Sequence, residues 1–476
     1  MSELKLAANL TARTQQFCLG LEDGDAEILE LVTPATAELL KWWFMRDVCE
    51  ARRINFHEGQ KQAILNTIVA HEAACVVGAS APYNHGAPLA GVRGASTLKE
   101  LYQILAAEEL LEGPRLAEVS QPKHAHPKYC LKMATGTGKT WVMQALLVWQ
   151  LLNKTADPAD VRFTRQFLIV APGLIVYDRL LDAFCGKLKD GLRDFATSDV
   201  ARYAELFMPE TYREQVFGFV RGNVCTKEEI GLKATGNGMI AIANWHALAE
   251  AEEDEAEIEV DAPGAVAEPH EVVNALLPVM PGKSAGNSLD VLDRRYARGG
   301  LLDFLAGLAE LLVFNDEAHH IHEVKKEGES SEVEWQKSLS SIAESKGRRF
   351  IQVDFSATPY NDVGSGKNKR KAYFPHIVVD FDLKSAMRAG LVKSLALDKR
   401  KEIGALPLEF KAEVDDDGNR TLAEGQRVML RAGLAKLRKL ERDFAAIDPA
   451  RHPKMLVVCE DTNVSPLVAQ FLRDEG

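Results

Sequence analysis

The segment Lys132–Met143, KMATGTGKTWVM, constrains the fold of this 476-residue chain more than any other feature. The residues KYCLKM at 128–133 are typical of a short strand, and WVMQALLVWQLL at 141–152 has the apolar spacing of a helix. The glycine-rich turn between them ends in Lys139 and Thr140. A strand, a glycine-rich loop and a helix in this order predict a phosphate-binding loop in an α/β fold.

Each residue of this loop has a chemical reason to be there. Glycine allows the close approach and positive φ that inward-pointing N–H groups require, and Gly136 and Gly138 supply it. In a P-loop the lysine reaches the β- and γ-phosphates of ATP and the next hydroxyl binds Mg²⁺. The strict pattern has a glycine where this chain has Met133. Nucleotide contacts are therefore expected from Thr135, Gly136, Thr137, Gly138, Lys139 and Thr140.

Further along, the chain alternates between strands and helices. Short apolar segments at 128–134, 167–172, 238–244, 311–316 and 350–358 are separated by helix-compatible stretches, which predicts a parallel sheet covered on both faces. Residues 28–70 carry helix signals, with Thr33-Pro34 as a start. An acidic run at 250–261 interrupts the alternation and indicates an insertion at about 249–290.

Two carboxylates after an apolar strand are the second candidate element. Asp316 and Glu317 follow LLVF at 311–314. An isolated acidic pair of this kind is more often a solvated loop. A Mg²⁺-ATPase, however, needs one carboxylate for the metal and one for the attacking water. Three histidines nearby, at 319, 320 and 322, suggest zinc, but no cysteine or further ligand lies close enough in sequence to complete such a site.

Composition excludes several other classes of protein. A net charge of -12 argues against coating nucleic acid by bulk charge, although it leaves room for a local basic groove. The seven cysteines form no CxxC pair, which predicts neither a zinc site nor a disulfide framework. No apolar run approaches the roughly 18 residues that span a bilayer, and the N-terminus lacks a signal-peptide core. A cytoplasmic protein with no membrane partner is expected.

Taken together, the motifs resemble those of a known family. ATGTGKT at 134–140, DEAH at 316–319 and SATP at 356–359 are similar to motifs I, II and III of superfamily 2 helicases, in the same order. Within that superfamily the chain most resembles the Res (motor) subunit of type III restriction enzymes. Further matching stretches lie at 55–64, 167–181, 239–248, 378–397 and 455–472, so the resemblance covers roughly residues 50 to 476.

The resemblance implies a role for each matching residue. Gln60 would lie at the adenine, Lys139 at the β- and γ-phosphates, and Thr140 and Asp316 at Mg²⁺. Glu317 would activate water, and the catalytic set would be Glu317, Asp316 and Lys139. His319, Ser356 and Thr358 would couple hydrolysis to movement. The DNA backbone would be contacted by the segment after the second strand, at Pro172, Gly173 and Arg179.

The same resemblance implies the domain plan and the partners. The expected fold is a RecA-like parallel sheet with flanking helices, preceded by helices and followed by the start of a second RecA-like lobe. The expected parts are a helical extension at 1–50, the ATP-binding domain at 51–390, a helical linker at 391–450 and the second lobe from 451 to 476. Because that lobe normally supplies an arginine to the cleft, the chain is expected to be an N-terminal part or to be completed by a partner. Double-stranded DNA and a modification (specificity) subunit are the expected partners.

Three other functions stay open from sequence alone. Among motors, the runner-up is a superfamily 2 helicase acting on other nucleic acid such as RNA. A P-loop ATPase or kinase without a nucleic-acid partner is a second possibility, and a truncated nucleotide-binding module without turnover is a third. The order of the motifs favours a motor, and the leading hypothesis is an ATP-dependent DNA translocase or helicase of the type III restriction kind, acting in restriction or another anti-phage role.

Overall fold

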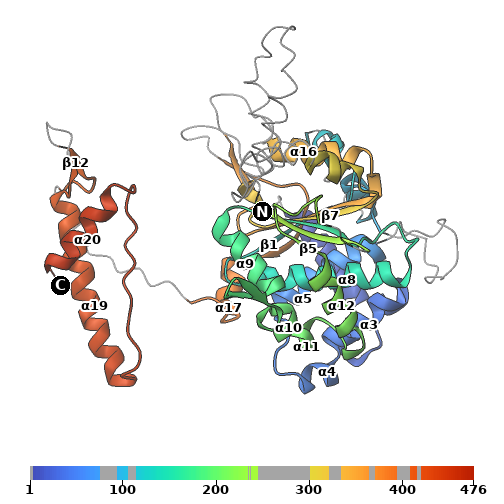
Figure 1. Cartoon of the computed structure of the whole chain (residues 1–476), viewed down its shortest axis with the longest axis horizontal. Coiled ribbons are helices and arrows are strands. Elements are labelled where there is room, and N and C mark those ends of the chain that lie inside the picture. Colours follow the sequence, from blue (N-terminus) through green and yellow to red (C-terminus); the bar gives the residue numbers. More distant parts are fainter. Residues whose placement is uncertain are drawn as a thin grey trace, which may run out of the picture. The chain divides into compact units, whose positions relative to one another are not determined.

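The computed structural model describes residues 4–74, 94–105, 114–233, 235, 237–244, 301–320, 334–363, 370–393, 408–414 and 420–475. By packing, the chain divides into two compact units, here called unit 1 (Met1–Lys393) and unit 2 (Ser394–Gly476) (Figure 1). The four-part domain plan expected from the sequence stays a prediction. The expected acidic insertion lies outside the described residues. Within the described residues, no helix has the length and apolar character needed to cross a membrane.

Unit 1 is built on a seven-stranded sheet whose neighbouring strands are all parallel, in the order β11-β1-β8-β7-β2-β6-β5. The strands are β1 (Lys128–Met133), β2 (Gln166–Ala171), β5 (Val224–Cys225), β6 (Met239–Asn244), β7 (Leu311–Asn315), β8 (Phe350–Ser356) and β11 (Ile377–Phe381). The five strands expected from the apolar segments are β1, β2, β6, β7 and β8, so the prediction of a parallel α/β sheet is confirmed. The edge strands β5 and β11 complete it.

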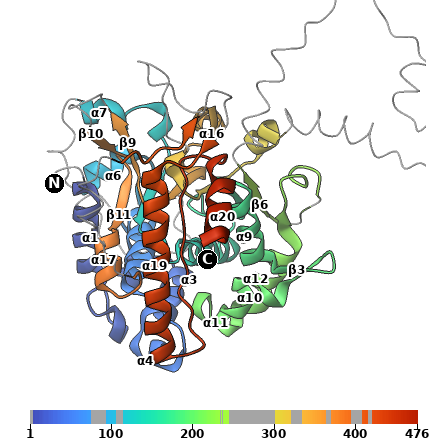
Figure 2. The ribbon, with the colours of Figure 1, turned by 90° about the vertical axis from the view of Figure 1, so that its left-hand side faces the viewer.

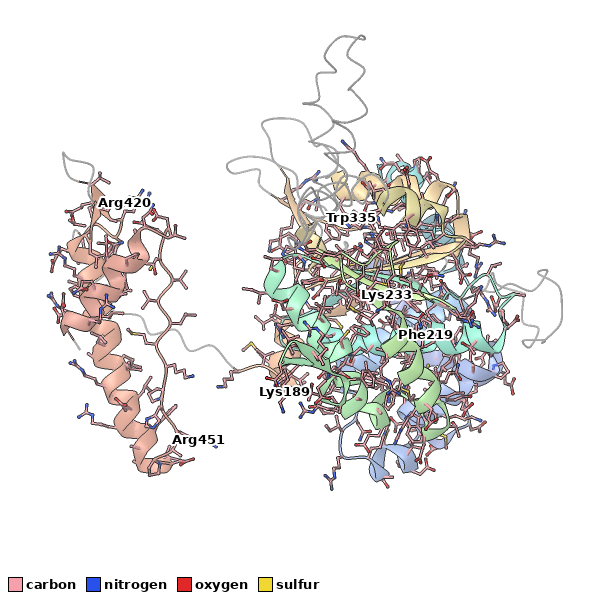
Figure 3. The ribbon with its side chains drawn as sticks, viewed as in Figure 1. Lys189, Phe219, Lys233, Trp335, Arg420 and Arg451 are labelled. Atoms are coloured by element: carbon pink, nitrogen blue, oxygen red, sulfur yellow. The ribbon has the colours of Figure 1, made fainter. Side chains whose placement is uncertain are left out.

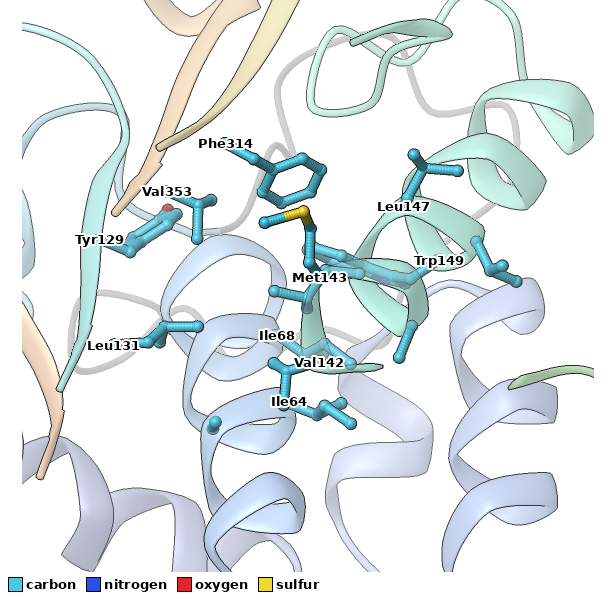
Figure 4. Close-up of a cluster of buried hydrophobic side chains, with 14 of the residues drawn as sticks. Ile64, Ile68, Tyr129, Leu131, Val142, Met143, Leu147, Trp149, Phe314 and Val353 are labelled. Carbon is cyan, nitrogen blue, oxygen red and sulfur yellow. The ribbon is translucent and has the colours of Figure 1, made fainter. Parts of the chain in front are cut away.

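Successive side chains of a strand point to opposite faces of the sheet, and the two faces differ in chemistry. On β8, Ile351, Val353 and Phe355 belong to the main apolar core. Figure 4 shows this core, where Phe314 lies beside Met143 of α8, and Ile68 of α5 lies beside Val142. The helices that contribute to this core include α3 (Pro34–Phe44), α5 (Glu58–Ile68), α8 (Lys139–Ala156), α9 (Leu174–Cys185) and α12 (Glu210–Asn223).

The opposite face is covered by α16 (Glu334–Glu344), whose Trp335 and Leu339 form a second core with Leu311 and Val313 of β7. Figure 1 shows α16 on one side of the sheet and α5, α8 and α12 on the other. Phe350, Gln352, Asp354 and Ser356 alternate with the apolar residues of β8 and are all buried. Several polar groups therefore lie inside the protein on this face.

The N-terminal helices pack into unit 1. They are α1 (Lys5–Phe17), α2 (Ile28–Leu31), α3 and α4 (Arg46–Ala51), and α1 lies against β11. Thr33 caps α3 by accepting a hydrogen bond from the Thr36 N–H, and Pro34 occupies the first helical position. The expected helical character of residues 28–70 and the start at Thr33-Pro34 are confirmed. Trp43 is fully buried and its Nε1 donates to the Phe207 carbonyl at 2.9 Å.

Shorter elements connect these layers. The helices are α6 (Leu98–Ile104), α7 (Pro114–Val119), α10 (Asp199–Arg202), α11 (Ala204–Phe207) and α17 (Leu383–Arg388). Two small antiparallel pairs join β3 (Lys187–Lys189) to β4 (Leu192–Asp194) and β9 (Tyr360–Val363) to β10 (Arg370–Tyr373). Figure 2 shows the β9–β10 pair beyond one end of β11.

Unit 2 contains α19 (Glu424–Ile447) and α20 (Val464–Glu475), which lie side by side (Figure 2), and a small pair formed by β12 (Glu413–Val414) and β13 (Arg420–Thr421). The strand expected from MLVV at 455–458 is absent, because no strand of the described residues pairs with this segment. Leu456 and Val458 are 88% and 86% exposed. The helix expected after it is α20.

Candidate nucleotide-binding site

The three candidate motifs meet at one edge of the sheet. Strands β1, β8 and β7 are neighbours and parallel, so their carboxyl ends lie together. The glycine-rich loop follows β1, the pair Asp316-Glu317 follows β7, and Ser356 ends β8. This edge is where ligands of open α/β sheets bind. The tertiary structure thus brings together residues far apart in the chain, such as Lys139, Glu317 and Ser356.

The glycine-rich loop has the backbone that its sequence predicts. Gly136 and Gly138 have φ of 82° and 74°, in the left-handed region that side chains disfavour. A Cβ built on Gly136 would meet no atom within 4 Å, whereas one on Gly138 would lie 2.5 Å from Gln60 Nε2. Helix α8 begins at Lys139, so its first N–H groups face the loop. The loop is therefore an open cradle with a helix N-terminus at its end, which suits a polyphosphate.

Gln60 holds this loop from the side. Its Nε2 donates to the Gly138 carbonyl at 3.2 Å, and its Oε1 accepts from the His57 N–H at 3.2 Å. Gln60 is only 3% exposed. The structure thus places Gln60 against the P-loop, while its expected contact with an adenine stays a prediction.

His57 is a residue of the site that the sequence analysis missed. Its Nδ1 accepts from the Gly59 and Gln60 N–H groups at 3.1 and 3.3 Å, which leaves Nε2 to donate to the Thr137 carbonyl at 2.9 Å. Burial lowers the pKa of His57, in agreement with this neutral tautomer. The sequence could have predicted at most a helix start here, because Gln60 has the spacing of a capping box from His57, although that pattern has Ser or Thr at the first position.

Lys139 and Glu317 form an ion pair across the site. Their side chains are 10% and 24% exposed, so the pair is largely shielded from solvent. Glu317 has φ of 48°, which is uncommon for a residue other than glycine. Backbone strain of this kind concentrates at functional sites, where the surrounding structure holds it. The strained turn directs the Glu317 carboxylate to the lysine of the P-loop.

Asp316 occupies a position that favours a cation. Its backbone N–H donates to the Val170 carbonyl at 2.9 Å, which ties the end of β7 to β2. Burial raises the pKa of Asp316, and the Glu317 charge raises it further, while the Lys139 and Arg179 charges oppose the shift. A divalent cation would relieve this penalty, and the Asp316 carboxylate and the hydroxyl of Thr140, the second residue of α8, are oxygen donors of the kind that Mg²⁺ accepts. The residues present fit Mg-ATP.

His319 connects the acidic turn to the end of β8. Its Nδ1 lies 3.0 Å from Ser356 Oγ and 3.6 Å from Glu317 Oε2. Ser356 is fully buried, and its Oγ accepts from the Thr358 N–H at 3.0 Å. The Thr358 side chain is exposed. Four of the expected residues, Glu317, His319, Ser356 and Thr358, therefore form one connected chain of contacts.

The segment after β2 is partly open to solvent at this edge. Pro172 and Gly173 are partly exposed, and a Cβ on Gly173 would meet no atom within 4 Å. Helix α9 begins at Leu174 and carries Arg179, which is exposed. The effect of Arg179 on the pKa of Asp316 shows that its charge acts on the same edge. A role of these three residues in binding DNA stays a prediction.

Comparison with known proteins assigns the family. A family model described as the type III restriction enzyme, res subunit, matches residues 53–361, which are 309 of the 476 residues and include all three motifs. No curated protein and no solved structure matches the chain. The chain belongs to the family of type III restriction enzyme Res subunits, which are helicase-like ATP-dependent motors.

Proposed function

We propose that the chain hydrolyses Mg-ATP at the edge of β1, β7 and β8 and couples this hydrolysis to movement along duplex DNA. The observation that carries the proposal is the connection of Lys139 to Glu317 and of His319 to Ser356. These contacts join the P-loop, the acidic turn and the end of β8 into one site. Family membership supports the motor function.

The proposed roles combine what the resemblance implies for each residue with the contacts that the structure gives it. Thr135, Gly136, Thr137 and Gly138 would surround the phosphates through the loop backbone, and Gln60 would supply the adenine contact. Thr140 and Asp316 would hold Mg²⁺, which would offset the negative charge of the phosphates. Lys139 pairs with Glu317 in this structure. A γ-phosphate that takes Lys139 as its partner would release the Glu317 carboxylate to accept a proton from the attacking water.

Coupling would proceed from Glu317 through His319 to Ser356 and Thr358. His319 contacts both the acidic turn and Ser356, so a change of partner at Glu317 alters the contacts at the end of β8. On the same edge, Pro172, Gly173 and Arg179 would contact the DNA backbone. Such phosphate contacts position a protein on DNA without reading its sequence. A separate modification subunit would provide sequence recognition.

The test is ATP hydrolysis with and without duplex DNA, in the wild type and in Glu317→Gln. The matched control is Glu310→Gln, because Glu310 pairs at 2.6 Å with Lys154, near the other end of α8. We expect DNA to stimulate turnover, Glu317→Gln to reduce it by at least about a hundredfold, and Glu310→Gln to preserve it.

Each alternative predicts a different result. Stimulation by RNA alone would indicate a helicase acting on other nucleic acid, and turnover indifferent to any nucleic acid would indicate an ATPase without such a partner. Binding of nucleotide with no turnover would indicate a nucleotide-binding module. Turnover that survives Glu317→Gln would show that Glu317 does not activate the water.

A further inference from the structure

The face of the sheet opposite the main apolar core carries a row of buried polar side chains. Each member is at most 1% exposed: Lys128, His126, Asn315, Gln336, Gln352, Asp354 and His376. Burying a polar group costs free energy unless it is hydrogen-bonded. An apolar row would serve the packing of α16 equally well. The chemistry of this row therefore calls for a reason beyond burial.

Asp354 is the centre of the row. Its Oδ1 accepts from Asn315 Nδ2 at 2.7 Å and from Gln352 Nε2 at 2.9 Å. Its Oδ2 accepts from His376 Nε2 at 2.8 Å. Asn315 and Asp354 are also register partners on β7 and β8, so their bond runs directly between neighbouring strands.

The position of these two residues relates them to the nucleotide site. Asn315 immediately precedes Asp316 and Glu317, and Asp354 lies two residues before Ser356. The bond therefore joins β7 and β8 one residue below the acidic turn. A side-chain hydrogen bond at this point restricts how the turn after β7 can shift or rotate relative to β8. The reason is that the hydrogen bond from the Asn315 amide is favourable only over a narrow range of angles.

Helix α16 adds a third constraint on Asn315. Trp335 Nε1 donates to Asn315 Oδ1 at 3.4 Å, so both ends of the Asn315 amide are engaged. Trp335, labelled in Figure 3, is itself fully buried in the core between α16 and the sheet. Helix α16 lies between the acidic turn and β8 in the sequence, so its packing can fix the position of the turn relative to β8.

We propose that Asp354 is a positioning residue for the nucleotide site: through Asn315 it holds Asp316 and Glu317 where they meet the metal and the attacking water. This inference rests on the proposed function. It differs from a purely structural role in one respect. A structural role affects only stability, whereas a positioning role also affects the part of nucleotide affinity that depends on Mg²⁺.

Exchange of the two side chains tests the bond. Asn315→Asp brings two carboxylates into contact, and adding Asp354→Asn restores one N–H···O bond between the same positions. Trp335 keeps an acceptor in both variants. The readout is binding of a non-hydrolysable ATP analogue in Mg²⁺ and in EDTA, with the kcat of ATP hydrolysis as a second readout.

We expect Asn315→Asp to reduce the Mg²⁺-dependent gain in affinity and the kcat by about tenfold or more, since small misplacements of catalytic groups have effects of this size. The affinity in EDTA should change by a smaller factor, because the P-loop follows β1 and only its Lys139 contacts the acidic turn. In the double variant, the Mg²⁺-dependent gain in affinity and the kcat should recover to within about threefold of their values in Asp354→Asn, since residues in direct contact show the strongest coupling between mutations.

The matched control is Asn153→Asp, which makes the same change at a buried asparagine on α8. Asn153 lies 14 residues after Lys139, about 21 Å along the helix, and should affect stability alone.

Three results would overturn the inference. The first is a lower melting temperature of Asn315→Asp with an unchanged Mg²⁺-dependent affinity and kcat. The second is a double variant in which neither readout recovers. The third is an equal effect of Asn153→Asp on the Mg²⁺-dependent affinity. A wild-type chain that binds no ATP analogue would instead refute the proposed function, and this inference with it.

Discussion

Substitution of the two glycines of the P-loop by alanine should have unequal effects. Gly136 and Gly138 have nearly the same φ, 82° and 74°, so the backbone cost of a side chain is similar at both, about 1–2 kcal/mol. Their surroundings differ. A Cβ on Gly136 has open space, whereas a Cβ on Gly138 lies 2.5 Å from Gln60 Nε2, a contact that requires a shift.

The size of the difference follows from the contacts of Gln60. Although Nε2 is the end of a flexible side chain, Gln60 is buried and hydrogen-bonded at both ends, to Gly138 and to His57. Moving it breaks the bond to Gly138 and leaves the buried Gln60 Nε2 without its acceptor, at about 1–3 kcal/mol, whereas the Gly138 carbonyl still accepts from the Trp141 and Val142 N–H groups. We expect Gly138→Ala to destabilise by about 1–3 kcal/mol more than Gly136→Ala.

Urea unfolding followed by tryptophan fluorescence measures this difference. All six tryptophans lie between Trp42 and Trp335, so the signal reports on unit 1 alone. In a Gln60→Ala background the clash is absent, and the two alanine variants should then differ by less than about 0.5 kcal/mol. Equal costs in the wild-type background, or a difference that persists without the Gln60 side chain, would refute the reasoning.

Three further predictions concern the site and the fold. Lys139→Met removes the partner of the Glu317 carboxylate and should reduce ATP turnover by at least about a hundredfold; a steady-state assay in which turnover persists would exclude the proposed role of Lys139. Burial raises the pKa of Glu72 to about 7 from an ordinary 4.5. Between pH 4.5 and about 7, Glu72 therefore keeps a proton in the folded state that it loses in the unfolded state. The free energy of unfolding consequently falls as the pH rises through this window. In Glu72→Gln, urea titrations between pH 4.5 and 7 should show a flatter dependence on pH, and an unchanged slope would assign the pH dependence to other groups. Leu456 is 88% exposed, so Leu456→Asp should change the melting temperature of unit 2, followed by circular dichroism, by an amount equivalent to less than about 0.5 kcal/mol; a large loss would mean that this side chain is covered in solution.

The sequence by itself determined the features that depend on local pattern. Apolar segments predicted five strands of the sheet, because a strand buried on both faces must be apolar over its whole length. The glycines, Lys139 and Thr140 predicted a phosphate loop, because few residues permit that backbone. The order of the three motifs predicted the family that the comparison assigns.

Some sequence expectations depended on partners that the pattern does not specify. The segment 455–458 is as apolar as the observed strands, yet it forms no strand, because a strand requires a neighbour with which to form hydrogen bonds. The N-terminal helices were expected as an extension, and they pack with the sheet in unit 1. Apolar spacing predicts that a helix buries one face, but not what it packs against.

Only the tertiary structure decided which polar groups meet. His57 touches a loop 80 residues away, and Asp354 accepts from Asn315 on the neighbouring strand and from His376, which immediately precedes β11. These contacts have no local signature, because an Asn or Asp in an apolar strand has the same neighbours in sequence whether or not its side chain finds a partner. Strand order and register decide that partner, and both are set by packing of the whole sheet.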